Sequence, residues 1–258
     1  MIGRATLEVR GLVRHFAGVR AVDGVSLQLA AGECVALIGP NGAGKSTTFA
    51  CIAGQQQPDA GQVIWRGRSL LGLSPLQRVA SGVGRTFQVA QLFDALTVMG
   101  HVQLALQARD RALSAWQPLA SWQPDQARNL LDQAGLSAWA RHDASALPYG
   151  ARKRLELAMV LAGRPELLLL DEPAAGLAEG ERETLMAWIL SLARSGLAVL
   201  YTEHNMDAVA GVADRVLVLI EGRIAAEGSF EQVAAHPEVQ ARYLGRVNAQ
   251  ATTGVPRA

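Results

Sequence analysis

The segment GPNGAGKST, residues 39–47, combines residue types that can hold a polyphosphate. Its glycines allow the backbone to curl so that several N–H groups point inward at an anion. Lys45 supplies a positive charge for the β- and γ-phosphates, and the Ser46 hydroxyl is suited to binding Mg²⁺. The spacing fits the phosphate-binding loop G-x-x-x-x-G-K-[ST] between a strand and a helix, which a chance glycine turn would not explain. The residues expected to bind the nucleotide are Gly39, Asn41, Gly42, Gly44, Lys45, Ser46 and Thr47.

Two further apolar runs end in side chains suited to phosphate hydrolysis. LLLLDEP places Asp171 at a strand end, where its carboxylate can hold Mg²⁺, and Glu172 beside it can polarise an attacking water. YTEHN places His204 just past another buried strand, where a neutral imidazole can reach the γ-phosphate or orient that water. Such acids and single histidines are often structural, but the phosphate loop favours the catalytic interpretation. Because open parallel sheets bind ligands at their carboxyl edge, we expect these groups to meet there.

Hydrophobic patterning predicts the elements that position these residues. Residues 5–38 read as β structure that closes with the apolar strand CVALI, and a helix is expected from about Lys45. The composition then turns helical from about residue 90 to 162, with the stretch QPLASWQP expected as a loop. Uninterrupted apolar runs at 167–170 and 197–202 predict central parallel strands that are covered on both faces. A further strand is expected at 215–220.

The segment LPYGARKRLELA, residues 147–158, has the outline of a helix start with an unusual first turn. That turn carries Arg152, Lys153 and Arg154, although the amino end of a helix favours acidic side chains. Taken alone, the bases would be read as a solvated face of the helix. The alternative is that an anion comes to lie next to them.

Bulk properties narrow the class of protein. A chain of 258 residues, half of them hydrophobic, can build a substantial α/β core. The formal charge of +1 provides no field that would attract nucleic acid, so we expect no nucleic-acid partner. Cys34 and Cys51 lack metal-ligand spacing and are expected as buried thiols in a reducing compartment. No signal-peptide core and no apolar run of about 20 residues is found, so we expect a cytoplasmic protein.

Together these residues resemble the ATP-binding subunit of ABC transporters over residues 5–245, leaving 246–258 as a polar tail. The resemblance implies an α/β fold with a P-loop NTPase core of ABC type, an antiparallel β subdomain and a helical subdomain inserted at about 90–160. It further implies that Phe16 stacks on adenine. Gln88 would sense Mg²⁺ and the attacking water and would face the membrane partner. The cofactors implied are ATP and Mg²⁺, with Glu172, His204 and Gln88 as catalytic residues.

By this resemblance, LPYGA of the present chain occupies the position of the family's signature sequence LSGGQ. In the family, that signature caps the γ-phosphate of ATP bound to the other subunit of a dimer. Tyr149 and Gly150 are therefore expected to bind nucleotide held by the partner. The basic first turn would then be completed by that nucleotide. Pro148, Tyr149 and Ala151 depart from the family's pattern, and Ala178 stands where Asp or Asn is usual. These departures put the symmetry and rate of hydrolysis between two sites in question.

Several segments look like the branched-chain amino-acid uptake branch of the family. They are GVGRTFQVAQLFDALTV, DEPAAGL, TEHNMDAV and VQARYLG. That resemblance implies an ATPase that energises membrane permease subunits through a surface around residues 88–98. A second ATP-binding subunit, identical or not, and indirectly a periplasmic substrate-binding protein would complete the system at the inner face of the plasma membrane. A urea importer or a lipopolysaccharide exporter ATPase is the alternative within the family. A slow nucleotide-switch module is the alternative of another class, whereas a kinase or GTPase is disfavoured because the N-K-x-D signature is absent.

Overall fold

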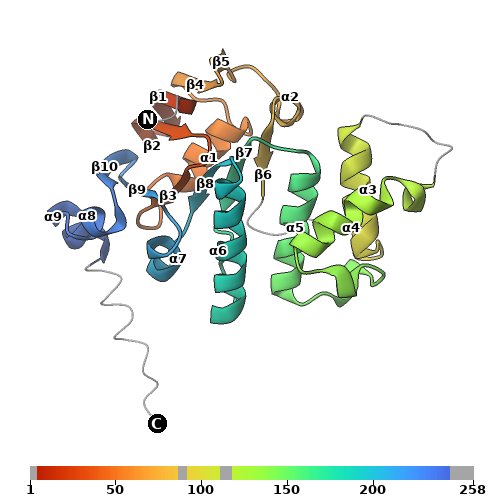
Figure 1. The fold of residues 1–258 in the computed structure, drawn as a ribbon. Coiled ribbons are helices and arrows are strands. Elements are labelled where there is room, and N and C mark those ends of the chain that lie inside the picture. Colours follow the sequence, from red (N-terminus) through yellow and green to blue (C-terminus); the bar gives the residue numbers. More distant parts are fainter. Residues whose placement is uncertain (1–4, 87–91, 111–117, 245–258) are drawn as a thin grey trace, which may run out of the picture.

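Two β-sheets form the core of the structure, a computed structural model that describes residues 5–86, 92–110 and 118–244 (Figure 1). The smaller sheet is antiparallel, with strand order β2-β1-β4-β5. The larger sheet has the order β10-β9-β3-β8-β7-β6, and only β10 runs antiparallel to its neighbour. The strands of the smaller sheet are β1 (Ala5–Phe16), β2 (Val19–Ala30), β4 (Ala60–Trp65) and β5 (Arg68–Ser69). Those of the larger are β3 (Cys34–Ile38), β6 (Val83–Arg85), β7 (Leu167–Asp171), β8 (Ala198–Thr202), β9 (Arg215–Ile220) and β10 (Arg223–Gly228).

The three strands in the middle of the larger sheet are buried along their whole length. Every residue of β3, β7 and β8 is buried, as their uninterrupted apolar sequences predict for parallel strands covered on both faces. Alternate residues serve two different cores. Leu37, Leu169 and Leu200 pack toward the smaller sheet and α1, whereas Leu168 and Tyr201 pack toward α6 and α7 on the other face.

The helices flank these sheets or form a separate cluster. α1 follows the phosphate loop, and α6 lies along the larger sheet (Figure 1). α3, α4 and α5 pack on one another beside the sheets, and we call these three the helical cluster. The helices are α1 (Lys45–Ala53), α2 (Pro75–Ala80), α3 (Val98–Arg109), α4 (Pro124–Gln133), α5 (Tyr149–Ala162), α6 (Glu179–Arg194), α7 (Met206–Ala210), α8 (Phe230–Ala234) and α9 (Pro237–Val239).

Sequence periodicity predicted the three helices of the cluster and, for α5, the face that it buries. On α5, Leu155, Ala158 and Ala162 are fully buried, and Met159 packs against the same core. The stretch expected as a loop between α3 and α4 contains a short 3-10 turn, Leu119–Ser121. The predicted buried state of Cys34 and Cys51 is confirmed. The polar tail expected at 246–258 lies outside the described residues.

Candidate nucleotide-binding and hydrolysis site

The phosphate loop connects β3 to α1 and is enclosed by other backbone segments on two sides. At Gly39, with φ +148°, a Cβ atom would lie 2.1 Å from the Leu219 carbonyl oxygen. At Gly44, with φ +100°, it would lie 2.0 Å from the Ala21 carbonyl oxygen. Both positions therefore need a residue without a side chain, as the sequence pattern predicted. The Gly222 amide also donates to the carbonyl oxygen of Ala43, at 3.0 Å, and so ties the β9–β10 turn to the loop.

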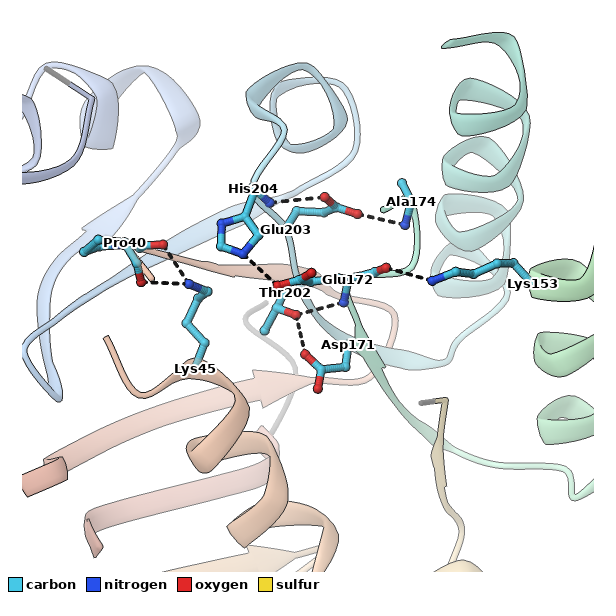
Figure 2. Close-up of polar contacts among 10 residues, drawn as sticks. Pro40, Lys45, Lys153, Asp171, Glu172, Ala174, Thr202, Glu203 and His204 are labelled. Atoms are coloured by element: carbon cyan, nitrogen blue, oxygen red, sulfur yellow. Dashed lines mark hydrogen bonds and ion pairs between the residues drawn. The ribbon is translucent and has the colours of Figure 1, made fainter. Parts of the chain in front are cut away.

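Lys45 begins α1 and is buried, with 6% of the residue exposed. Its ammonium donates to the carbonyl oxygens of Gly39 at 2.7 Å and Pro40 at 3.0 Å, within the loop (Figure 2). Burial lowers the pKa of this lysine, while the carboxylates of Glu172 and Asp171 act in the opposite direction. The charge therefore lies at the centre of the loop, close to both acidic groups. Ser46, one residue on, is exposed at the start of the helix.

The strand order brings the sequence-predicted groups to one edge of the larger sheet. β8 lies between β3 and β7, and Thr202 is in register with both Leu37 and Asp171. The chain leaves β3 into the phosphate loop, leaves β7 into Glu172 and leaves β8 toward His204. The three segments therefore meet at the carboxyl edge, where open parallel sheets bind ligands. Figure 2 shows their side chains converging on this edge.

Asp171 and Glu172 are joined through a buried threonine. The Thr202 hydroxyl donates to Asp171 Oδ1 at 2.8 Å and accepts from the Glu172 amide at 2.9 Å (Figure 2). Glu172 has a φ of +48°, a left-handed conformation that is strained for a residue with a side chain. The threonine thus fixes the backbone of the residue expected to act as the base. Sequence reasoning missed Thr202, which reads as the last residue of an apolar strand.

Glu172 and His204 are in direct contact, at 2.6 Å between Oε1 and Nε2. A carboxylate oxygen only accepts, so Nε2 carries the proton in this hydrogen bond. Glu203 fixes the backbone on either side, because its carboxylate accepts from the amides of Ala174 at 2.9 Å and His204 at 3.2 Å. Burial raises the pKa of Glu203. Sequence reasoning missed Glu203, although its position between two polar residues after a buried strand was a usable signal.

Arg85, at the end of β6, approaches the other oxygen of Asp171. Its Nη2 lies 3.4 Å from Asp171 Oδ2, and both side chains are largely buried. Burial lowers the pKa of Arg85, and the Asp171 carboxylate opposes that shift. Both oxygens of Asp171 therefore have partners, which holds the carboxylate in one orientation at the sheet edge. The sequence offered no signal for this ion pair, since its members are 86 residues apart.

Phe16 lies at the tip of the β1–β2 hairpin, where Ala17 and Gly18 both have positive φ angles. The Phe16 residue is 39% exposed, and the Arg14 guanidinium lies 4.7 Å from its ring centroid. Asp59 supports this arrangement by pairing with Arg14 at 2.8 Å and by accepting the His15 amide at 2.6 Å. The ring is thus a fixed, partly exposed surface of the kind an adenine base can stack on.

The three bases in the first turn of α5 bind carbonyl oxygens of their own chain. Arg152 donates to the carbonyl oxygens of Leu147 and Ser145, and Arg154 donates to that of Ala134. The ammonium of Lys153 donates to the carbonyl oxygen of Glu172 at 3.2 Å (Figure 2). Each of these side chains therefore binds a backbone carbonyl of its own chain, and completion of the basic turn by a partner's nucleotide stays a prediction.

The start of α5 has no side-chain cap. Pro148 is the N-cap and supplies no side-chain hydrogen bond, and Gly150 is buried next to the first turn of α6. A Cβ atom at Gly150 would lie 2.6 Å from Glu181 Oε1. Tyr149 remains 49% exposed. Ala178 likewise caps α6 without a side-chain hydrogen bond, which matches the two departures noted in the sequence. Gln88 lies outside the described residues.

The fold and the site define a class of protein. A glycine-rich loop that leads from a buried strand into a helix, with an aspartate at the end of a strand of the same parallel sheet, is the arrangement of a P-loop nucleoside triphosphatase. Comparison with known families narrows the class, because the family model described as "ABC transporter" matches residues 22–175. The chain belongs to the ABC transporter family. Within it, this is an ATP-binding subunit and an ATPase.

Curated relatives and solved structures agree with this assignment. The chain is 39% identical to the high-affinity branched-chain amino acid transport ATP-binding protein LivG of Escherichia coli (strain K12), over 93% of this chain and 97% of that protein. It is 36% identical to the corresponding protein BraF of Pseudomonas aeruginosa, over 95% and 99% of the two chains. A crystal structure of the ADP conformation of an ATP-binding cassette of an ABC transporter has a TM-score of 0.85, with 28% identity over 94% of this chain and 99% of that one.

Proposed function

We propose that the chain hydrolyses MgATP with Glu172 as general base and thereby energises a membrane permease for branched-chain amino acids or related amides. The observation that carries the chemistry is the 2.6 Å contact between His204 and Glu172, at the sheet edge that also holds the phosphate loop. The substrate class is supported by LivG and BraF, which are branched-chain amino acid transport proteins and match nearly the whole chain.

Nucleotide binding uses the phosphate loop and the hairpin tip. The backbone amides of residues 39–47 surround the β- and γ-phosphates, and the dipole of α1 favours the negative charge. Lys45 exchanges the carbonyl oxygens of Gly39 and Pro40 for phosphate oxygens, which relieves the burial of its charge among neutral groups. Phe16 stacks on adenine with the ring face that Arg14 leaves open.

The residues present fit Mg²⁺. Ser46 offers an exposed hydroxyl next to Lys45, Asp171 offers a carboxylate at the same sheet edge, and Gln88 is the third side chain that the resemblance assigns. Within the described ranges, no group of three or more His, Cys, Asp or Glu could hold a metal alone. Mg²⁺ does not need such a group of side chains, because it is commonly held by one or two protein oxygens together with substrate phosphates and water. When bound, the cation neutralises charge on the phosphoryl oxygens.

Hydrolysis depends on residues at the ends of β7 and β8. Glu172 accepts a proton from the water that attacks the γ-phosphate, and the Nε2–H group of His204 orients its carboxylate. Thr202 keeps Asp171 and Glu172 in a fixed relation through its two hydrogen bonds. The positive charge of Lys45 stabilises the transferring phosphoryl group.

Two such subunits, identical or paralogous, are needed for a complete site. The start of α5, with Tyr149 and Gly150, caps the γ-phosphate held by the partner's phosphate loop, since free amides at a helix start bind anions. ATP thereby closes the two subunits, and hydrolysis reopens them. The permease contacts the segment 88–98, in which Phe93 is 62% exposed. A periplasmic binding protein delivers substrate from the other side.

The helices in the described part of the chain are all too short or too polar to cross a bilayer. In the proposed system, separate permease chains form the translocation path. The ATP-binding subunit itself is placed in the cytoplasm, on the inner face of the plasma membrane.

Replacing the general base tests the chemistry. We expect Glu172→Gln to lower turnover of ATP by about 10²–10⁴, because a positioned general base contributes a factor of that size. Nucleotide affinity should be unchanged, since the phosphate loop is intact. Phosphate release by the purified chain, alone and mixed with a paralogous subunit, measures turnover. Glu183→Gln, an exposed acid on α6, is the matched control and should retain wild-type turnover.

The same experiment decides between an ATPase and a slow nucleotide-switch module. The module has one observation in its favour: Pro148 and Ala178 leave α5 and α6 without side-chain caps. If wild type and Glu172→Gln release phosphate equally slowly, in both the single and the mixed samples, the chain is a switch. A loss that is specific to the Glu172 variant supports the motor.

Transport assays test the substrate class. A strain that lacks this chain should lose uptake of labelled leucine, and the wild-type chain should restore it while Glu172→Gln should not. Retained leucine uptake together with lost urea uptake would instead favour the urea importer. If both leucine uptake and urea uptake are retained and lipopolysaccharide export is defective, the result would favour the lipopolysaccharide exporter ATPase.

A further inference from the structure

Lys153 joins the helical cluster to the hydrolytic centre. It belongs to α5, yet only 5% of the residue is exposed, and its ammonium donates to the backbone carbonyl oxygen of Glu172 at 3.2 Å. A buried ammonium is costly unless it is hydrogen-bonded, so its position is determined by the groups around it. A charge-assisted bond of this kind is stronger than a bond between neutral groups. The contact therefore fixes the backbone on which the general base is carried.

The peptide groups of Glu172 are held from two sides. Its amide donates to the Thr202 hydroxyl on β8, and its carbonyl oxygen accepts from Lys153 on α5 (Figure 2). Between these two bonds the residue has a φ of +48°, a conformation that an L-residue keeps only when its surroundings enforce it. The direction of the carboxylate toward His204 depends on that conformation. Removing one of the two bonds frees the backbone to relax.

Tyr149 connects the same lysine to the start of α5. The Lys153 ammonium lies 5.6 Å from the Tyr149 ring centroid, within reach of a cation–π interaction. The ring also lies next to Gly176, where an added Cβ atom would be 3.2 Å from Tyr149 Cε1. The segment expected to cap the partner's nucleotide therefore packs against the loop that follows Glu172. A shift of α5 would therefore be transmitted to the Glu172 carboxylate through Lys153.

We propose that Lys153 is a positioning residue for hydrolysis: it holds Glu172 in its left-handed conformation and so makes the catalytic centre depend on the position of the chain's own α5. The inference rests on the proposed function, in which Glu172 is the general base. Displacement of a catalytic group by about 1 Å can cost about 10² in rate. Loss of the lysine therefore acts on turnover, whereas nucleotide binding at the phosphate loop is unaffected.

Three variants of the full-length chain test the proposal. We expect Lys153→Met to lower kcat for ATP by about tenfold to a hundredfold with KM and nucleotide affinity unchanged. Lys153→Arg keeps a donor and should recover most of the lost turnover. Arg154→Met is the matched control, because it removes the neighbouring base of the same helix, which donates to Ala134 within the helical cluster. It should change thermal stability but leave kcat at the wild-type value.

A double-mutant cycle separates positioning from a general effect on folding. In the Glu172→Gln background, Lys153→Met should cause no further loss, because the carboxylate that it positions is gone. An equal loss in both backgrounds, or equal losses in Lys153→Met and Arg154→Met, would overturn the proposal. So would turnover by Lys153→Met within twofold of wild type. If wild type itself shows no turnover, the proposed function fails; active wild type with unaffected Lys153→Met refutes this inference alone.

Discussion

At the residue scale, the phosphate loop depends on contacts that leave no room for a side chain. Gly44 combines a φ of +100° with a backbone carbonyl in the space of its missing Cβ. Gly42, two residues earlier, also has a positive φ, of +79°, but faces open space. The pair therefore separates the cost of backbone conformation from that of a steric clash.

We expect Gly44→Ala to lower the free energy of unfolding by about 3–5 kcal/mol, from left-handed strain together with overpacking. Gly42→Ala should cost about 1–2 kcal/mol, since only the strain applies. Urea unfolding measures both values, and equilibrium binding of a fluorescent ATP analogue checks whether the loop survives. Equal costs for the two variants would show that the loop moves away from Ala21 and that the enclosure is not rigid.

The residues of the site were predictable to different extents. Lys45 was found from the spacing of the phosphate loop. Asp171, Glu172 and His204 were found because each lies at or just past the end of an apolar strand, and parallel strand ends meet at one edge. Lys153 was noticed only as a base in the wrong place. Its true acceptor lies 19 residues away, on a different element, and no local pattern encodes that contact.

At the element scale, α3 is anchored by a buried histidine. His101 is fully buried; its Nδ1 lies 2.9 Å from the Thr97 carbonyl oxygen, and its Nε2 accepts from the Phe93 amide at 2.9 Å. These two bonds require the neutral ring with the proton on Nδ1. Burial lowers the pKa of His101 below its ordinary value of 6.5, while the bond to Thr97 opposes the shift. The histidine thus holds the segment that contains the exposed Phe93.

The sign of the pH dependence follows from that lowered pKa. Below about pH 6.5 the unfolded chain binds a proton at His101 that the folded chain does not, so stability falls as pH falls. We expect this residue to contribute a slope of up to about 1.4 kcal/mol per pH unit below pH 6.5. Replacing it by Gln, which keeps an acceptor, should flatten the slope measured by urea unfolding between pH 7.5 and 5.5. A His101 variant that follows the wild-type curve would refute the assignment.

The positions of the elements along the chain were more predictable than which elements lie next to one another in space. Apolar runs located β7, β8 and β9, and the spacing on α5 identified its buried face. Strand order was beyond the sequence, because β3 pairs with β8 and β9, which follow it by more than 160 residues. That order nevertheless creates the site, since it sets His204 between the phosphate loop and Glu172.

At the scale of the whole molecule, apolar side chains form three cores. Two lie on opposite faces of the larger sheet, and the third lies within the helical cluster. α5 and the partly buried Trp188 of α6 contribute to both the third core and the core beneath α6. Because the third core is formed within the helical cluster, we expect the cluster to open with limited disturbance of the phosphate loop. The same arrangement is required if a movement of α5 is to act on Glu172 through Lys153.

Leu131 tests the independence of the third core. It is fully buried on α4, and we expect Leu131→Ala to destabilise the helical cluster by about 2–5 kcal/mol through lost burial and a cavity. Hydrogen exchange should accelerate in α3 and α4 while amides of β3 and β7 keep their wild-type protection, because local opening follows the separate core. Affinity for a fluorescent ATP analogue should remain, since the phosphate loop belongs to the sheet.

The neighbouring Leu130, which is only partly buried, gives the matched control. Leu130→Ala should accelerate exchange less in the same two helices, in proportion to the apolar surface it removes from contact. If Leu131→Ala accelerates exchange equally in α3 and in β3, the three cores unfold as one unit. In that case a displacement of α5 could not occur without loosening the nucleotide site. Unequal exchange instead means that the helical cluster can open while the sheet stays folded, as the proposed movement of α5 requires.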